Sequence, residues 1–386
     1  MNKSSQVTQT DVVITGGGPA GIYLGIRLIQ QGISVVILEQ RHSINLHSKS
    51  LGIHPVSLEL FDEAGIVQPF LEQGIKIEEG AAFAGKDFIG TLQFSEELPA
   101  PYNFILAIPQ YKTEEILENM LQRQQGEALI RGATLTDIDS SDNHVVVTYN
   151  HGGEQKKISC EYVVGCDGKN SIVRRQAKIL YTGSPYPDTY VMGDFDDNTS
   201  FGPKAAVYLH KNGLIESFPL PDAKRRWVAK TRKYMKTPSP DDLREIVQSR
   251  IGHSLAGKEN YMVSSFGVQH HLADPFYKGR ILLAGDSAHV VSPIGGQGMN
   301  LGWLTAKDAS EAIEKAFKVP SKREAAFRKY SQKARKRAKK VGKRAEVNMR
   351  LGRAHSYSRA RKLIAGAIVR SPLSKVAANI FAMRYL

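Results

Sequence analysis

The chain has 386 residues, of which 41% are hydrophobic and 23% are charged, and its formal net charge is +14. This length exceeds what one hydrophobic core usually organises, so two domains are expected, and no run reaches the roughly 20 apolar residues that a membrane-spanning helix needs. The polar first ten residues, followed by only a short apolar run, argue against a secretory signal, so we expect a cytoplasmic protein.

The first predicted elements are a strand, a glycine-rich turn, a helix and a second strand. Residues 11–15 form a β-branched strand, residues 16–21 read Gly-Gly-Gly-Pro-Ala-Gly, and the helix that follows ends at Gly32. Residues 33–38 form a second buried strand that leads to Glu39. This order predicts a βαβ unit with a parallel sheet.

The turn contains the pattern Gly-x-Gly-x-x-Gly at Gly16, Gly18 and Gly21. Such glycines allow a tight turn and the close approach of a pyrophosphate, whose charge is stabilised by the helix N-terminus. Glu39 is placed to accept hydrogen bonds from a ribose, and we expect it to lie nearer to solvent than Asp286 of the third motif described below. The alternative interpretation of this pattern, taken alone, is an ordinary glycine-rich turn that binds no ligand.

The middle of the chain predicts one helix and many strands. Residues 111–124 have helical periodicity, and residues 144–149 and 157–164 predict a hairpin around His151-Gly152-Gly153. The pattern from 185 to 266 is typical of strands separated by proline-rich joints at Pro219, Pro221, Pro238 and Pro240. Cys160 and Cys166 are expected along one extended segment, about 20 Å apart at ~3.3 Å per residue, which is too far for a disulfide. Two thiols cannot complete a four-ligand metal site, and no His/Asp/Glu cluster has ligand spacing, so no metal is predicted.

Two further glycine-rich motifs follow buried strands. Residues 165–174 read Gly-Cys-Asp-Gly-Lys-Asn-Ser-Ile-Val-Arg and include Asp167. Residues 285–289 read Gly-Asp-Ser-Ala-His, and residues 293–300 read Pro-Ile-Gly-Gly-Gln-Gly-Met-Asn. An ordinary turn is the alternative for each motif alone. Four glycines and a proline around one acid nevertheless carry a cost in chain entropy. That cost favours a loop whose backbone a ligand approaches closely.

Most of the positive charge lies in the last part of the chain. From Lys318 onward there are 21 basic residues and only two acids, Glu324 and Glu346, which is a net charge of +19. Apolar residues recur there at helical spacing, so one face can pack while the basic face stays in water. We weigh a helix packed on the body of the protein against peripheral contact with an anionic inner membrane surface, and we expect no nucleic-acid binding. The two apolar series are Phe327, Tyr330, Ala334, Ala338, Val341 and Ala345, and Leu373, Val376, Ala377, Ile380 and Phe381.

In this order and at these separations, the three glycine motifs resemble the flavoprotein hydroxylases typified by para-hydroxybenzoate hydroxylase, including their ubiquinone-biosynthesis branch. The resemblance implies that Asp167 serves both FAD and NAD(P)H and that Asp286 binds the ribityl or ribose hydroxyls. It also implies that Pro293 and Gly295 position the reacting edge of the flavin, with no side-chain acid or base assigned. The cofactor-binding residues that it implies are Gly16, Gly18, Gly21, Glu39, Arg41, Lys49, Gln110, Asp167, Asp286, Gly298, Met299 and Asn300.

Lys49 departs from the family pattern, because many members carry an arginine there. Lysine keeps the charge but lacks the planar fork that contacts phosphate at two points, and Arg41 is a candidate to compensate. Gly295 to Asn300 match the loop and helix start whose backbone N–H groups face the flavin's pyrimidine end, where the reduced cofactor carries negative charge.

The resemblance implies an α/β fold with three parts. These are a Rossmann-like FAD-binding domain with a central parallel sheet (1–80, 105–180 and 267–320), a substrate domain with a mostly antiparallel sheet (81–104 and 181–266), and a basic helical C-terminal region (321–386). One face of the second sheet would cover the flavin. The substrate-side candidates are Tyr208, His210, Glu216, Arg226 and Trp227, and a packed or solvated strand residue is the favoured reading of each. Alternation places Tyr208 and His210 on one face.

The resemblance also implies an FAD- and NAD(P)H-dependent monooxygenase. NAD(P)H reduces FAD, O2 adds at the flavin C4a position, and the resulting hydroperoxide transfers one oxygen to a hydrophobic aromatic or quinone-like ring. The sequence does not distinguish NADH from NADPH. A flavin-dependent reductase of a prenyl-lipid or polyketide substrate and a non-catalytic basic FAD-containing binding protein are the alternatives.

Overall fold

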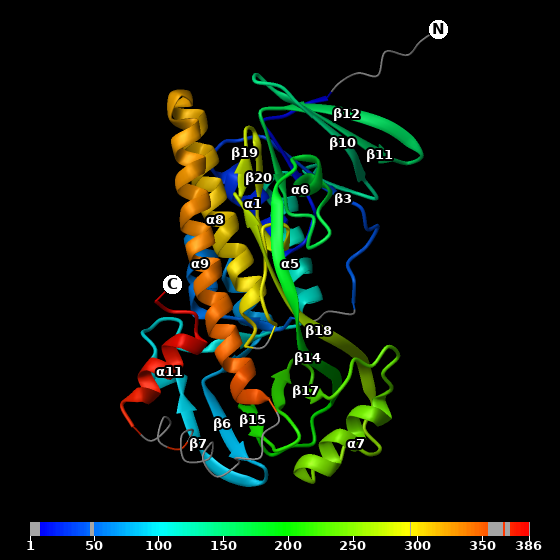
Figure 1. Cartoon of the computed structure of the whole chain (residues 1–386), viewed down its shortest axis with the longest axis vertical. Helices are drawn as coiled ribbons and strands as arrows, with labels where there is room; N and C mark the ends of the chain where they lie inside the picture. The colour runs from blue at the N-terminus through cyan, green and yellow to red at the C-terminus, as the bar shows by residue number, and fades with distance from the viewer. Residues whose placement is uncertain (1–7, 47–49, 294, 354–365, 367–370, 386) are drawn as a thin grey trace.

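The computed structural model describes residues 8–46, 50–293, 295–353, 366 and 371–385 (Figure 1). A six-stranded sheet lies in the upper half of the molecule as drawn and an eight-stranded sheet in the lower half. Two long strands, β14 (Leu180–Asp196) and β18 (Asn260–Asp274), run between the two halves. The α/β fold that the sequence predicts is confirmed.

The six-stranded sheet has the order β19-β20-β13-β2-β3-β9 and is parallel except for the edge pair β19 and β20. All four residues of β2 and of β13 are buried, as expected for central parallel strands that are covered on both faces. The strands are β2 (Val12–Thr15), β3 (Val35–Glu39), β9 (Leu129–Arg131), β13 (Tyr162–Gly165), β19 (Tyr277–Lys278) and β20 (Ile281–Leu283).

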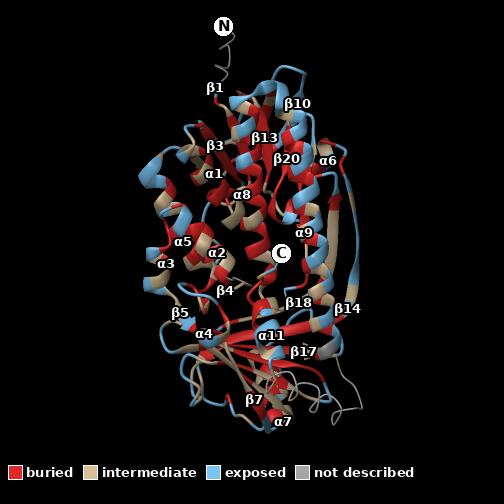
Figure 2. Ribbon diagram, turned by 90° about the vertical axis from the view of Figure 1, so that its left-hand side faces the viewer, coloured by how far each residue is buried: buried red, intermediate tan, exposed pale blue. Residues whose placement is uncertain are grey.

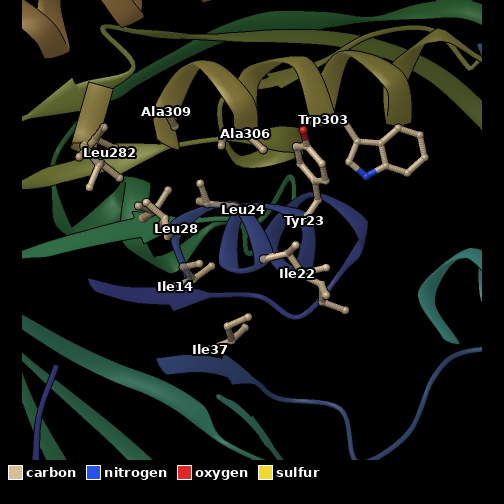
Figure 3. Close-up of a cluster of buried hydrophobic side chains, with 14 of the residues drawn as sticks. Ile14, Ile22, Tyr23, Leu24, Leu28, Ile37, Leu282, Trp303, Ala306 and Ala309 are labelled. Atoms are coloured by element: carbon tan, nitrogen blue, oxygen red, sulfur yellow. The ribbon is translucent and has the colours of Figure 1, made fainter. Parts of the chain in front are cut away.

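Helices cover this sheet, and α1 (Pro19–Gln30) lies between the sheet and α8 (Gln297–Lys318). Figure 3 shows side chains of α1 between Ile14 and Ile37 on one side and Trp303 and Ala306 on the other. The Trp303 indole N–H donates to the Pro19 carbonyl at 3.0 Å, which ties the start of α1 to α8. The other helices of this half are α2 (Pro55–Glu63), α3 (Gln68–Gln73), α5 (Gln110–Gln124) and α6 (Ile172–Gln176).

The eight-stranded sheet has the order β21-β18-β14-β17-β16-β15-β6-β7, and only the pair β15 and β6 is parallel. Its mostly antiparallel character agrees with the prediction, while the exact domain boundaries stay a prediction. The remaining strands are β6 (Glu79–Ala84), β7 (Asp87–Gln93), β15 (Ala205–Leu209), β16 (Ile215–Leu220), β17 (Lys224–Thr231) and β21 (His289–Val290).

The two faces of this sheet pack against different partners, and Figure 2 shows buried residues along several of its strands. On one face Ile215, Trp227 and Ala229 pack against Leu243 and Val247 of α7 (Pro240–Ile251). On the other face Tyr190, Met192, Leu214 and Val228 pack against Met349 of α9 (Arg323–Gly352). We call the second face the α9 face.

Helix α7 corrects the prediction that residues 185–266 form strands only. Its start is a capping box: the Ser239 hydroxyl accepts the Asp242 N–H at 3.2 Å, and the Asp242 carboxylate accepts the Ser239 N–H at 2.7 Å. The predicted joint at Pro219 is also wrong, because Pro219 lies within β16 and pairs with Arg225. The signal for α7 was present in the sequence Ser-Pro-Asp-Asp at 239–242.

Two smaller sheets complete the fold. The predicted hairpin is confirmed as β11 and β12, but β12 ends at Cys160 and the chain then enters β13 of the six-stranded sheet before Cys166. The single extended segment expected there is therefore wrong, and both cysteines are free thiols. The strands are β1 (Thr8–Gln9), β10 (Thr134–Ser140), β11 (Val145–His151) and β12 (Glu154–Cys160) in one sheet, and β4 (Gly52–Ile53), β5 (Ile75–Ile77) and β8 (Ile105–Ala107) in the other.

Helix α9 follows a short 3-10 helix, η2 (Pro320–Lys322), and packs along α8. The first predicted apolar series is confirmed, since all six of its residues are buried. The Ser331 hydroxyl accepts the Phe276 N–H at 3.0 Å, and Asp308 of α8 pairs with Lys333 at 2.7 Å and Arg337 at 2.6 Å.

We expect Asp308→Ala to lower the free energy of unfolding by about 3 kcal/mol, because it leaves the largely buried Arg337 without its carboxylate. Glu314→Ala is the matched control, since it breaks an exposed pair with Lys318 on the same helix and should cost at most about 0.5 kcal/mol. Urea denaturation of both variants measures the difference. Equal losses in the two variants would contradict a role for Asp308 in holding α9.

The last helix, α11 (Leu373–Phe381), packs near the short helix α4 (Phe94–Glu97). Ala378 and Asn379 are its buried residues, and Ala382 and Met383 directly after the helix are buried too. Three members of the second predicted series are exposed. These are Leu373, Val376 and Phe381. Of the helices in the described ranges, none is both long and apolar enough to cross a membrane.

Candidate nucleotide-binding and active site

The first glycine motif connects β2 to α1, and glycine suits its three positions for different structural reasons. A Cβ on Gly16 would lie 2.3 Å from the Cys166 carbonyl oxygen, and one on Gly21 would lie 2.0 Å from the Gly16 carbonyl oxygen. Side chains are therefore excluded at both positions by the fold itself. A Cβ on Gly18 meets no atom within 4 Å, so the space before the N-terminus of α1 is open to a ligand.

Glu39 lies at the end of β3 and is only 4% exposed. Its carboxylate accepts the Gly17 N–H at 2.7 Å and both the N–H and Nε–H of Arg41 at 2.9 Å. Burial alone would raise the pKa of this carboxyl, but these hydrogen bonds outweigh it and the pKa is lowered. The expectation that Glu39 lies nearer to solvent than Asp286 is wrong, because Asp286 is the exposed one.

Three predicted cofactor residues are joined by an acid that sequence reasoning missed. Glu114 of α5 is buried, accepts a hydrogen bond from Gln110 at 2.9 Å and lies 3.8 Å from the Arg41 guanidinium. Arg41 also contacts Glu39, so Glu39, Arg41 and Gln110 belong to one network. Lys49 lies outside the described residues, and no local pattern in the sequence singled out Glu114.

The second motif is held against the first and the third. One oxygen of Asp167 accepts the N–H groups of Ile172 at 2.6 Å and Val173 at 3.2 Å, which caps α6. Its other oxygen is buried and has no hydrogen-bond partner among the described residues. Burial raises the pKa of this carboxyl. The Arg174 guanidinium donates to the Ser287 carbonyl at 2.8 Å and so ties this motif to the third.

The third motif begins with a 3-10 helix, η1 (Gly285–Ser287), beside the start of α1. A Cβ on Gly285 would lie 3.1 Å from the Ala20 Cβ, which brings the first and third motifs together. The Asp286 side chain is open to solvent, yet the protein around it raises the pKa of its carboxyl to about 6. An accessible carboxyl with this shift fits a position in a recess and not on an outer surface.

The segment after Pro293 leads into α8 through two left-handed glycines. Gly295 has φ +85° and Gly296, the N-cap of α8, has φ +66°, so side chains would be strained there. The Asn300 side chain accepts the His54 N–H at 2.8 Å and donates to the Gly52 and Gly296 carbonyls at 2.9 and 2.8 Å. Because the Asn300 side chain is used within the protein, only its backbone is free for the predicted cofactor contact. That contact stays a prediction, as do those of Gly298 and Met299.

Buried polar atoms without hydrogen-bond partners gather around Gly295. Among the described residues they include both amide atoms of Gln297, Nδ1 of His54 and Nδ2 of Asn348. The position of a Cβ on Gly295 lies 3.6 Å from the Asn348 Nδ2, and burial lowers the pKa of the His54 imidazole to about 4. Buried unpaired groups are rare in folded proteins, so several in one place fit a site that takes a polar ligand. The sequence carried no signal for His54, Gln297 or Asn348 as a group.

Known proteins resemble this chain over most of its length. Residues 9–345 match a family described as FAD binding domain. A rifampicin monooxygenase of Streptomyces venezuelae is 29% identical over 76% of this chain and 61% of its own length. A protein of Bacillus subtilis named as an uncharacterized aromatic compound monooxygenase is 31% identical over 80% of this chain and 62% of its own length. The chain thus spans about three fifths of these two curated relatives.

Solved structures share the fold. A p-nitrophenol 4-monooxygenase of Pseudomonas putida superposes with a TM-score of 0.87 at 19% identity and covers 97% of both chains. An anhydrotetracycline hydroxylase of Streptomyces rimosus superposes with a TM-score of 0.79 at 26% identity and covers 98% of this chain and 77% of that one.

Proposed function

This chain belongs to the FAD binding domain family, and from that membership we propose that it is an FAD-dependent monooxygenase that uses NAD(P)H and O2 to hydroxylate a hydrophobic aromatic or quinone-like substrate. The observation that carries the proposal is the convergence of three glycine motifs, distant in sequence, beside the open space before α1. The monooxygenases among its relatives support the reaction class.

The residues fit FAD at several points. Open space at Gly18 and the N-terminus of α1 suit a pyrophosphate, and Glu39 at the end of β3 suits the adenosine ribose. The accessible carboxylate of Asp286 would accept hydrogen bonds from ribityl hydroxyls. The N-terminus of α8, with Gly298 and Met299 in its first turn, would stabilise negative charge on the ring. Bound FAD would supply the electron transfer and the oxygen activation. The chain would bind and orient the cofactor and the substrate and shield them from water.

Purified protein titrated with FAD, then assayed with NADH and NADPH, tests the proposal. We expect FAD uptake at micromolar concentration and NAD(P)H oxidation that accelerates with a phenol, a quinone precursor or a polycyclic aromatic. With ¹⁸O2 the product should gain one labelled oxygen atom. Product without the label would indicate a reductase, and FAD binding without any turnover would indicate a binding protein. Failure to bind FAD would contradict the proposal outright.

We also propose peripheral contact between the C-terminal region and an anionic membrane. Exposed basic residues lie along the solvent side of α9, and α11 presents Leu373, 55% exposed, and Val376, 49% exposed, to solvent. Cationic residues near an anionic surface contribute about 1 kcal/mol each before screening, and exposed apolar residues can insert at the boundary. The exposed basic residues of α9 are Arg328, Lys329, Lys333, Lys336, Lys339, Lys340, Lys343 and Arg350.

We expect sedimentation with anionic but not with neutral vesicles at low salt. Raising salt from 0.1 to 1 M shortens the Debye length from about 10 Å to about 3 Å and should weaken binding. If α11 inserts, a salt-resistant fraction remains and is lost in a Leu373→Asp, Val376→Asp variant, which changes only exposed side chains. Equal absence of binding to both vesicles at low salt would contradict membrane contact.

A further inference from the structure

A recess at the end of helix α9 is lined mainly by basic side chains. Its volume is about 220 Å³, many times the roughly 10–15 Å³ that one water molecule needs. Its charged lining residues are Asp188 of β14, Lys230 of β17, Arg232 just after β17, and Arg353 directly after α9. The lining therefore carries three positive charges and one negative charge, and none of these residues belongs to the three glycine motifs.

The end of α9 is fixed beside this recess by the eight-stranded sheet. The Gly352 carbonyl accepts the Leu214 N–H at 3.1 Å, and the Leu214 carbonyl in turn accepts the Lys230 N–H at 2.9 Å. Arg353 thus leaves the helix next to the strand that carries Lys230, and Figure 1 shows this end of α9 beside β15 and β17. The wall of the recess is therefore shared between the sheet and the C-terminal region.

Asp188 holds two of the cations in place. It is only 1% exposed, and its carboxylate pairs with the Lys230 ammonium at 2.9 Å and the Arg353 guanidinium at 2.7 Å. Burial alone would raise the pKa of this carboxyl, but the hydrogen bonds from Arg353 and Lys230 outweigh it and the pKa is lowered. The carboxylate therefore stays ionised and orients both cations at the recess before any ligand binds.

Arg232 adds positive charge that the described part of the chain does not neutralise. Its side chain is exposed, and it has no ion pair or hydrogen bond with another described residue. A second guanidinium lies close by, since Arg250 of α7 donates at 3.3 Å to the carbonyl of Gly213, the neighbour of the lining residue Asn212. Burial and then the charge of Arg232 lower the pKa of Arg250 to about 10. Like charges gather here without a matching acid.

The recess is also rich in hydrogen-bond donors. Lys230 has three N–H groups and pairs with one carboxylate, so it can still donate to a ligand. The Arg232 guanidinium offers five N–H groups in a plane, and the Asn212 amide offers two. Lysine as a point charge and arginine as a planar fork are the side chains that bind phosphate oxygens in proteins. This set of donors suits an anion with several oxygens.

We infer that the recess binds a phosphate monoester, with Lys230 and Arg232 donating to its oxygens and Asp188 holding Lys230 and Arg353 in position. A phosphate monoester carries about −1.5 to −2 charges at pH 7, which matches the +2 balance of the lining, whereas a carboxylate carries only one charge. The group can belong to a soluble molecule or to the headgroup of an anionic lipid. This site is additional to the proposed flavin site.

The test uses the full chain saturated with FAD, so that the site proposed for the FAD pyrophosphate is filled. Calorimetric titration at constant ionic strength compares glycerol 3-phosphate with glycerate, a carboxylate that also has three carbons. We expect a preference of at least about 10-fold for glycerol 3-phosphate, as one further charge-assisted hydrogen bond would give. Arg232→Gln and Lys230→Gln should each weaken its binding about 10-fold.

Lys329→Gln is the matched control, because it removes the same charge from an exposed position near the start of α9. It should change the affinity for glycerol 3-phosphate less than about 2-fold, since a distant exposed charge is largely screened. Arg232 is exposed, so Arg232→Gln keeps the test open if Lys230→Gln does not fold. A failure of the proposed function would be seen separately, because flavin content and NAD(P)H oxidation are recorded on every sample.

Vesicles separate the two sources of the phosphate. A lipid headgroup site predicts more sedimentation with phosphatidic acid, a phosphate monoester, than with phosphatidylserine at matched surface charge, and Arg232→Gln should remove that difference. A site for a soluble ester predicts glycerol 3-phosphate binding without any such difference. Equal affinity for glycerol 3-phosphate and glycerate with no difference between the vesicles, or equal weakening by Arg232→Gln and Lys329→Gln, would overturn the inference.

Discussion

Replacing Asp286 by alanine is expected to lower the affinity for FAD by a factor of about 30 or more. Two charge-assisted hydrogen bonds to ribityl hydroxyls would be lost, which together contribute about 2–5 kcal/mol. The carboxyl is open to a ligand and makes no hydrogen bond or ion pair in the described structure, so its removal should leave the fold intact. Equilibrium titration of the apoprotein with FAD measures the change.

Two comparisons sharpen this result. Asp139→Ala removes an exposed acid from β10, in another sheet, and should leave FAD affinity unchanged.

The pKa of the Asp286 carboxyl is raised to about 6, so the wild type should lose FAD affinity as pH falls below 6 and the acceptor becomes protonated. Asp286→Asn should bind FAD weakly and without that dependence. Unchanged flavin occupancy in Asp286→Ala would show that the ribityl contact has been misplaced.

Glu216→Gln is expected to be more stable than the wild type, and more so at high pH. Burial raises the pKa of Glu216 from 4.5 to about 7 on folding. The protonated carboxyl therefore contributes stability that is fully present below pH 4.5 and is lost as pH rises through 7. The advantage of the variant should be about 2–3 kcal/mol larger at pH 8 than at pH 5.

Urea unfolding of FAD-saturated wild type and variant at the two pH values measures this difference. Tyr190 is the ionisable neighbour whose pKa Glu216 affects, and its own pKa is raised far above this range, so it does not titrate there. Glu154→Gln, in the exposed hairpin, should show no such pH dependence. A variant less stable than the wild type at pH 8 would mean that Glu216 has a stabilising partner.

Local sequence patterns predicted individual helices and strands better than they predicted contacts between distant parts of the chain. The glycine turn, α1 and β3 follow from residues 11–39, and the buried face of α9 follows from its spacing. Long-range contacts could not be predicted in this way: the bond between Asn300 and His54 joins residues 246 positions apart. The alternation of side chains along a strand also predicts only which residues share a face of the sheet, and not which helix covers that face. Tyr208 packs on the α7 side, stacked on Phe83, whereas Glu216 and Arg226 point to the α9 face.

Helix α9 limits how the two halves can move. At ~1.5 Å per residue its 30 residues span about 45 Å without interruption. Its first turns are fixed to the six-stranded sheet through Ser331, and its end is fixed to the eight-stranded sheet through Gly352. A hinge opening would have to bend the helix or break one attachment. Displacement of α11 alone leaves both attachments whole, so exchange of small molecules with solvent is expected to follow that route.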